Sequence, residues 1–236
     1  TRSSSVTGVQ TCALPISQNP FIKGTGWTPN YNAYLNMPQL GGANGEDLVI
    51  TWSWRTSSGL SDAGTGFTGY QTNNNINFAR STDAGLTWKR FGGSSYSLPI
   101  TRDLEVGAAN KAEIITTIPE GSSLINQAST CLDANDNPAT CTWWAPETAS
   151  SNYRRQYRVV FRDDNGTATL ADDTWQARNV SDRTTDPVGT RYAEDHVRDL
   201  GRPVIVADDA DRLIVSYRDN QGSPSLTPGV SNGLTI

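Results

Sequence analysis

Residues 81–88 read Ser-Thr-Asp-Ala-Gly-Leu-Thr-Trp, and this stretch decides the fold. Asp83 can accept hydrogen bonds from backbone N–H groups, and Gly85 can adopt a positive φ. Trp88 offers a large apolar ring that can pack between sheets. The stretch therefore predicts a tight hairpin turn between two antiparallel strands, with a structural rather than a chemical role.

Short runs of β-branched and aromatic residues lie on both sides of this turn. Gly, Pro, Asn and Asp separate them, which is the pattern of strands joined by turns. The runs are 47–55, 75–81, 87–91, 113–118, 126–132, 139–144, 156–162, 174–180, 203–207 and 212–217. No stretch of helical periodicity and similar length competes with them. The sequence therefore predicts an all-β fold.

The pattern Ser-x-Asp-x-Gly-x-Thr-Trp is known as an Asp box, which occurs in the turns of β-propellers in sialidases and many other proteins. It is informative about fold and says little about chemistry. Propeller blades have four strands each, and closed propellers have at least about four blades. About ten strands amount to two and a half to three blades. We therefore expect a β-propeller of four-stranded antiparallel blades, present over residues 17–236 as an incomplete fragment of about three blades.

The first residues do not resemble evolved protein. Residues 6–16 read Val-Thr-Gly-Val-Gln-Thr-Cys-Ala-Leu-Pro-Ile, which looks like the translation of a sequencing-library adapter. We predict that residues 1–16 are an artefact and that the natural N-terminus is missing, so the presence of a signal peptide cannot be judged. A signal-peptide remnant is a poor alternative, because no basic start precedes a long apolar run.

Composition narrows the partners. The chain has 24 Asp and Glu residues against 19 Lys and Arg. Nucleic-acid binding rests on clustered basic charge, so nucleic acid is not expected as a partner, and neither is a membrane. No apolar window approaches a membrane-spanning length. With one histidine, a tetrahedral zinc site is not expected. We identify no cofactor, and a structural calcium bound by carboxylates stays open without a located site.

Two cysteines remain once Cys12 is set aside with the artefact. Cys131 and Cys141 flank the turn-forming stretch 133–138 and are symmetric about residue 136. A cross-strand disulfide between them is feasible and would imply an oxidising compartment. Two unpaired, half-buried thiols are the alternative, because spacing alone does not fix the Cβ directions.

Seven phrases together resemble the Asp-box propeller family that contains ulvan lyases and related polysaccharide lyases. In order, they are 31–36, 50–55, 73–79, 98–101, 124–127, 155–158 and 201–203, and they cover nearly all of residues 19–220. The resemblance implies a carbon–oxygen lyase that cleaves an acidic, uronate-containing polysaccharide such as ulvan by β-elimination. It also implies a secreted, cell-surface or periplasmic location.

β-Elimination requires a group that neutralises the uronate carboxylate, a base for the C5 proton and an acid for the leaving oxygen. The resemblance implies that Tyr157 is the acid, with a role as base left open. The positive charges of nearby Arg154, Arg155 and Arg158 are expected to favour its phenolate. It implies that Arg183 binds the carboxylate through two parallel hydrogen bonds. The structural alternatives are a tyrosine packed on a strand and a surface ion pair of Arg183 with Asp182 or Asp186.

Asn74 is the chief departure from the family, since characterised ulvan lyases tend to have a histidine there. Asn can donate a hydrogen bond to a carboxylate but cannot act as a general base. The change moves the proton transfer toward Tyr157, or indicates another substrate or a lost activity; ordinary turn chemistry is the structural alternative. His196 could supply a base or a metal ligand from a loop, although a lone loop histidine is more often solvated.

Four further residues are candidates for substrate binding: Asn126, Gln127, Arg155 and Arg158. Asn126 and Gln127 could equally satisfy backbone groups between blades. Besides a soluble propeller that acts in protein binding, two other functions remain open. One is a sialidase-like glycoside hydrolase on the same fold, and the other is a non-catalytic glycan-binding propeller in which exposed Trp54, Trp143 and Trp144 stack on sugars.

Overall fold

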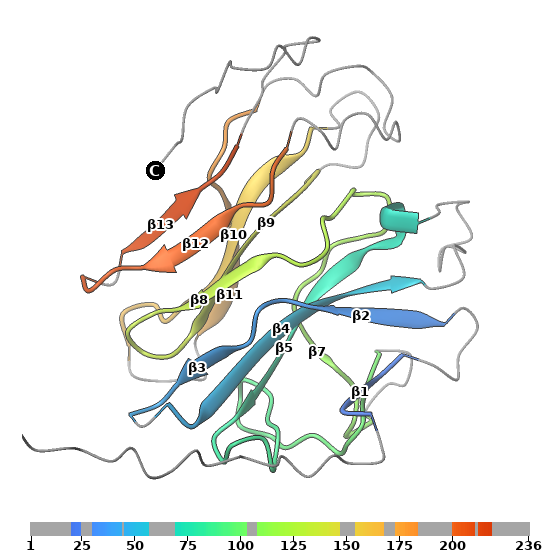
Figure 1. Ribbon diagram of the computed structural model, residues 1–236, viewed down its shortest axis with the longest axis vertical. Coiled ribbons are helices and arrows are strands. Elements are labelled where there is room, and N and C mark those ends of the chain that lie inside the picture. The colour runs from blue at the N-terminus through green and yellow to red at the C-terminus, as the bar shows by residue number, and fades with distance from the viewer. Residues whose placement is uncertain are drawn as a thin grey trace, which may run out of the picture.

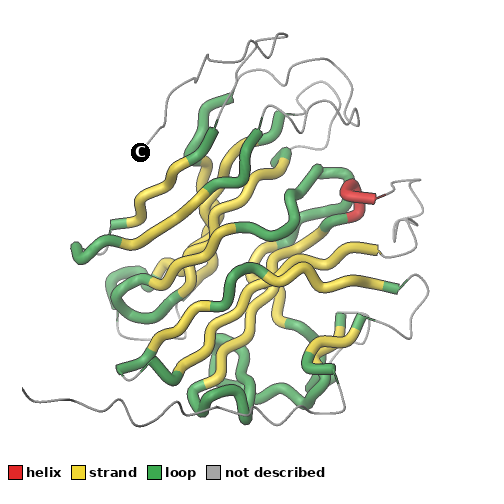
Figure 2. Tube along the Cα trace, viewed as in Figure 1, coloured by secondary structure: helices red, strands yellow, loops and turns green. Residues whose placement is uncertain are grey.

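The described part of the chain is built almost entirely of strands (Figures 1 and 2). The computed structural model describes residues 20–24, 30–43, 45–56, 69–102, 108–146, 154–167, 173–183, 200–210 and 212–218. They form thirteen strands and a single-turn 3-10 helix, η1 (Gly69–Thr72). Residues 1–16 and His196 lie outside the described residues. Within those ranges no helix has the length and apolar character needed to cross a membrane.

The first sheet is antiparallel and has the order β2-β4-β5-β7, with β3 also paired to β4. Its members are β2 (Tyr31–Leu35), β3 (Gln39–Gly41), β4 (Asp47–Thr56), β5 (Asn74–Ser81) and β7 (Glu113–Thr116). β2 pairs with the second half of β4 and β3 with the first half, so together they occupy one strand position. This sheet is therefore one blade, four strands wide.

The second sheet is a four-stranded antiparallel meander with the order β11-β10-β9-β8. Its strands are β8 (Ser129–Leu132), β9 (Pro138–Trp144), β10 (Gln156–Asp163) and β11 (Thr174–Asn179). A two-stranded sheet of β12 (Val204–Ala207) and β13 (Leu213–Ser216) follows, and β12 lies against β8. The short β1 (Ile22–Lys23) and β6 (Ile100–Thr101) form a parallel pair. The fold is that of a β-propeller, with two blades described and part of a third.

The blades pack face to face through apolar side chains. Ile76 and Phe78 of the first blade and Trp144 and Val160 of the second belong to one buried cluster. Because successive strand residues point to opposite faces, β10 directs Val160 toward the first blade and Tyr157 toward β12 and β13. The second blade therefore contributes to two interblade cores.

The Ser81–Trp88 turn is closed by the side chain of Asp83. Its carboxylate accepts hydrogen bonds from the backbone N–H of Thr87 (2.8 Å), the hydroxyl of Thr87 (2.6 Å) and the hydroxyl of Ser81 (2.8 Å). Gly85 has a φ of 90°, and the indole N–H of Trp88 donates to the carbonyl of Gly85 (3.1 Å). The run predicted as a strand at 87–91 is not one, since only Lys89 forms isolated bridges there.

An Asp83→Asn variant is expected to lower the melting temperature near neutral pH. The hydrogen bonds from Thr87 and Ser81 hold the pKa of Asp83 at about 2, below its ordinary value of 3.8. A depressed carboxyl pKa stabilises the folded state above the unfolded pKa, and this contribution is lost as the pH falls through the folded value. The difference in melting temperature between variant and wild type should therefore shrink between about pH 4 and pH 2, followed by calorimetry. A difference independent of pH would contradict this role.

The predicted centre of the turn between the cysteines is wrong by one residue. The backbone N–H of Asp133 donates to the carbonyl of Asn137 (2.9 Å), so the hairpin is centred on residue 135 rather than 136. Cys131 therefore pairs with Ala139, and Cys141 with Ser129. Both cysteines are free thiols, as in the alternative to the disulfide, but they are buried rather than half-buried.

Both thiols are expected to resist modification in the native protein. Cys131 is 8% exposed and Cys141 is fully buried, and burial raises the pKa of Cys141 to about 12. In a Cys12→Ser variant, a thiol reagent at neutral pH should label no cysteine in the folded chain and two after unfolding, counted by intact mass. A folded chain whose mass shows an internal disulfide would contradict the structure.

Candidate active site

The predicted site residues come from separate strands but lie at one end of the blades. This end, called the site end, is where β4 and β9 finish and β5, β8 and β10 begin, toward the upper right of Figure 1. Asn74 opens β5, Tyr157 is the second residue of β10, and Gln127 precedes β8. The Ser81–Trp88 turn follows β5 and so lies at the opposite end. An antiparallel meander brings alternate connections to the same end of a sheet, which explains why the predicted site residues lie at the site end.

Tyr157 is fully buried between the second blade and the β12–β13 sheet. Its ring lies 4.3 Å from that of Tyr217, centroid to centroid. Its hydroxyl donates toward the carbonyl oxygens of Gly201 (3.0 Å) and Arg218. A phenol has one proton, so the two carbonyls share it. Tyr157 thus connects the second blade to both flanks of the next sheet.

Burial decides the protonation state of Tyr157. Desolvation raises its pKa above the ordinary value, and the nearby charge of Arg183 lowers it by less. The expectation that Arg154, Arg155 and Arg158 favour the phenolate is therefore wrong, because loss of hydration dominates the pKa of Tyr157 and Arg183 is the arginine whose charge opposes it. At neutral pH the side chain is a phenol. It is suited to give a proton and unsuited to take one.

Arg183 is 2% exposed and follows β11, where the backbone ladder with β10 has ended. Its backbone is held by Gln156, which accepts from the N–H of Arg183 (3.0 Å) and donates to its carbonyl (2.7 Å). Arg183 is therefore not a surface arginine. The structure brings it close enough to Tyr157 to influence the phenol's pKa.

Asn74 lies in the first blade, paired with Trp54, whereas Tyr157 pairs with Trp143 in the second. The Asn74 side chain is 3% exposed, and its Nδ2 donates to the carbonyl of Thr72 (3.1 Å). Its Oδ1 is buried and accepts no hydrogen bond within the described structure. Asn74 thus makes a local turn bond and keeps one free acceptor.

The four candidate substrate-binding residues fall into two groups. Gln127 is exposed with a φ of 58°, and Asn126 is partly exposed, so both are accessible at the site end. Arg155 is 3% exposed beside the ring of Trp143. Arg158 points to the face of β10 opposite to that of Tyr157. There its guanidinium lies 4.4 Å from the Trp144 ring centroid and donates to the carbonyl of Ala177 (3.1 Å).

The tryptophans considered for sugar stacking are core residues. Trp54 and Trp143 are 1% exposed and Trp144 is 3% exposed. They belong to three different apolar clusters within and between the blades. The expectation that they form an exposed sugar-binding platform is wrong, because the strands that carry them are covered on both faces.

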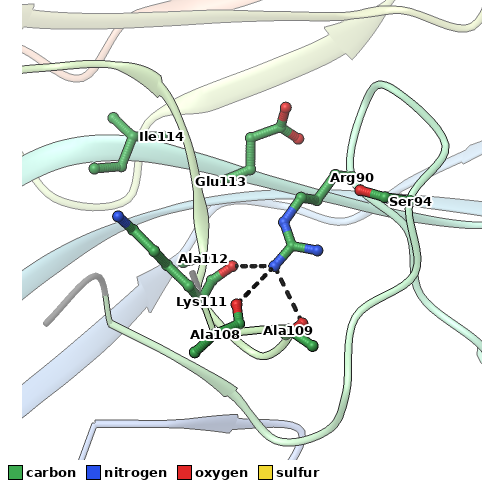
Figure 3. A pocket seen from close by; sticks show the side chains of 8 residues that line it. All are labelled: Arg90, Ser94, Ala108, Ala109, Lys111, Ala112, Glu113 and Ile114. Atoms are coloured by element: carbon green, nitrogen blue, oxygen red, sulfur yellow. Dashed lines mark hydrogen bonds between the residues drawn. The ribbon is translucent and has the colours of Figure 1, made fainter. Parts of the chain in front are cut away.

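Two cavities lie away from these residues. One, of about 490 Å³, is lined by residues that include Arg90, Lys111 and Glu113. Figure 3 shows Arg90 turned toward the carbonyl oxygens of Ala108, Ala109 and Lys111, to which it donates hydrogen bonds of 3.5, 3.1 and 2.8 Å. The other, of about 290 Å³, lies between the two blades near Phe78 and Arg162. Neither cavity is lined by a predicted site residue. Arg90 and Arg162, which line them, already donate hydrogen bonds to protein groups.

Sequence reasoning missed Gln156 and Ser181, which connect the candidates. Nothing in the Arg-Gln-Tyr-Arg phrase distinguishes Gln156 as more than a strand residue, and only its partners reveal the connection. In the described ranges, no group of three or more His, Cys, Asp or Glu side chains is placed to hold a metal ion.

Comparison with solved structures shows the same fold. The chain is similar to an ulvan lyase representing a new polysaccharide lyase family, with 18% identity and a TM-score of 0.52. It is equally similar to that lyase bound to -[GlcA(1-4)Rha3S]-, a saccharide of glucuronate and sulfated rhamnose. Each comparison covers 86% of this chain and 40% of the lyase. The chain thus spans about 40% of the length of these structures.

No curated protein sequence matches the chain significantly. A model for members of the BNR repeat-containing family matches residues 13–183. That segment is well over half of the 236 residues, and it contains the Ser81–Trp88 turn and both described blades. The chain therefore belongs to the BNR repeat-containing family.

Proposed function

We propose that this chain is part of a carbon–oxygen lyase that cleaves an acidic polysaccharide next to a uronate by β-elimination. The observation that carries the proposal is the buried phenol of Tyr157 with the charge of Arg183 close by, at the site end of the second blade. Family membership and the fold shared with ulvan lyases support it. A structurally similar lyase was solved with a glucuronate-containing saccharide, which favours a uronate substrate.

In the proposed reaction, Arg183 binds the uronate carboxylate through parallel N–H···O bonds and withdraws charge from it. The C5 proton then leaves to a base, and its electron pair forms the C4–C5 double bond. The bond from C4 to the leaving oxygen breaks, and the Tyr157 phenol donates its proton to that oxygen. Proton transfer from Tyr157 requires that its hydroxyl exchange a carbonyl partner, Gly201 or Arg218, for the leaving oxygen.

The base that accepts the C5 proton is neither Asn74 nor Tyr157. Asn74 has no basic atom, and Tyr157 is protonated at neutral pH. Asn74 is proposed to accept a hydrogen bond from the substrate through its free Oδ1, from a hydroxyl or a protonated carboxyl. His196 is the remaining candidate for the base. Asn126 and Gln127 are proposed to contact sugar hydroxyls because they are accessible at the same end, with Arg155 adding positive charge. Arg158 takes no part in this proposal, because its guanidinium lies over Trp144 on the other face of β10.

Product mass distinguishes this reaction from hydrolysis. Elimination leaves one fragment with an unsaturated uronate and adds no water, whereas a sialidase-like hydrolase adds one water at each cut. Mass spectrometry of oligosaccharides released from ulvan, glycosaminoglycans, pectin and alginate should show fragments without the added water. If every fragment carried the added water, the protein would be a hydrolase and the lyase proposal would be wrong.

A non-catalytic glycan-binding propeller is the second candidate. It is favoured by Asn74 in place of the family histidine and by the Tyr157 hydroxyl that already binds two carbonyls. Retention of the chain in gels containing an acidic polysaccharide, without any change in polymer length, would support this function. Either function implies a polymer outside the cell, so we propose a secreted, cell-surface or periplasmic location.

A further inference from the structure

We propose that Gln156 is a positioning residue that fixes Arg183 and Tyr157 relative to each other. This inference rests on the proposed function, because it assigns Gln156 a role through those two residues. Gln156 is 8% exposed and is the first residue of β10, directly before Tyr157. Its side chain points toward the segment that follows β11.

The Gln156 amide replaces a missing stretch of β-ladder. β11 ends at Asn179, and the last backbone bond beyond it runs from the N–H of Val180 to the carbonyl of Tyr157 (2.9 Å). At Arg183, the amide satisfies both backbone polar groups, as a neighbouring strand would: Oε1 accepts from N–H (3.0 Å) and Nε2 donates to the carbonyl (2.7 Å).

Ser181 extends this connection to Tyr157. Its hydroxyl donates to Oε1 of Gln156 (2.7 Å) and accepts from the backbone N–H of Tyr157 (2.9 Å). Gln156, Ser181 and Arg183 are all less than a tenth exposed. Buried hydrogen bonds of this kind restrict a segment to one geometry, since each broken bond leaves a desolvated polar group. The backbone from which the Arg183 guanidinium extends is therefore set by one side chain.

Only an amide fits these partners. Oε1 must accept two hydrogen bonds while Nε2 donates one to a carbonyl. A glutamate would place an oxygen against the carbonyl of Arg183, and a methionine of similar length would lose all three bonds. Gln156→Glu and Gln156→Met thus test the same connection in different ways, and either can serve if the other fails to fold.

The test is a double-mutant cycle with Arg183→Ala, scored by kcat/KM for elimination on the uronate polymer that wild type cleaves best. Gln156→Glu or Gln156→Met alone should lower kcat/KM by about 10²-fold, the size expected for a misplaced catalytic partner. In the Arg183→Ala background, the same substitution should change kcat/KM by no more than about twofold, because its target is already absent. Fully multiplicative effects would mean a merely structural role and would overturn the proposal.

Asn137→Ala is the matched control. Asn137 is a buried amide, 6% exposed, at the far end of the blades, where Nδ2 donates to Asp133 (3.1 Å) and Oδ1 accepts from Arg162 (2.7 Å). It should lower the melting temperature while the folded fraction keeps wild-type kcat/KM. If wild type shows no elimination, the lyase proposal fails, and the cycle is scored by affinity for ulvan instead. Additive effects on affinity, or no affinity at all, would then overturn the role of Gln156.

Discussion

Replacing Tyr157 with phenylalanine is expected to lower kcat for β-elimination by about 10²–10⁴-fold, the range for loss of a positioned general acid. Phenylalanine keeps the ring that packs on Trp143, Leu200 and Tyr217 and removes only the proton donor. The carboxylate contact through Arg183 is untouched, so affinity for the polysaccharide should stay within a few-fold, measured by retention in substrate gels. Full turnover in this variant would show that another group protonates the leaving oxygen.

The same substitution also removes a structural hydrogen bond, and the two effects must be separated. The hydroxyl of Tyr157 is the donor for the carbonyls of Gly201 and Arg218, and an unsatisfied buried group costs about 1–3 kcal/mol. Tyr96→Phe is the matched control. Tyr96 is 7% exposed and lies away from the site end. Its hydroxyl donates to the carbonyl of Phe78 (2.8 Å) and accepts from the backbone N–H of Glu113 (2.9 Å). It should lower stability comparably and leave elimination intact.

Replacing Arg183 with alanine is expected to weaken both binding and turnover, with kcat/KM falling by about 10²–10³-fold. The guanidinium is the proposed partner of the uronate carboxylate, and its charge also opposes the burial that raises the pKa of Tyr157. Without it, that pKa should rise further, so the phenol stays protonated and the loss reflects carboxylate binding. Steady-state kinetics on the best uronate polymer measure the effect.

Two comparisons make the Arg183 result specific. Arg183→Lys keeps the charge but cannot form two parallel hydrogen bonds with a carboxylate, so it should recover only part of the loss. Arg212→Ala removes an exposed arginine that pairs with Asp208 at the far end of the blades, and it should leave kcat/KM unchanged. An Arg183→Ala enzyme with wild-type KM and kcat would assign the carboxylate to a different residue.

Most of the strand positions could be predicted from the sequence. The apolar runs at 47–55, 139–144 and 156–162 became β4, β9 and β10 with boundaries shifted by at most one residue. These strands are covered on both faces, so their composition is distinctive. β2 and β3 were missed because the break at residues 36–38, which contains Pro38, divides one strand position into two short pieces.

Less of the candidate site could be predicted. Phrases such as Arg-Gln-Tyr-Arg indicated Tyr157, yet the direction of each side chain depends on which face of β10 meets which blade. The sequence therefore could not show that Tyr157 is buried or that Arg158 points away from it. The role of Gln156 was equally hidden, because its partners are more than twenty residues away and come together only when β11 pairs with β10.

Ultraviolet absorbance of the C4–C5 double bond tests the central claim most directly. The full chain is incubated separately with ulvan, glycosaminoglycans, pectin and alginate, beside the Tyr157→Phe and Tyr96→Phe variants. The account predicts a steady rise in absorbance with at least one uronate polymer for wild type and Tyr96→Phe, and a rise at least about 10²-fold slower for Tyr157→Phe. No rise with any polymer for folded wild type would contradict the assignment of this chain to β-elimination.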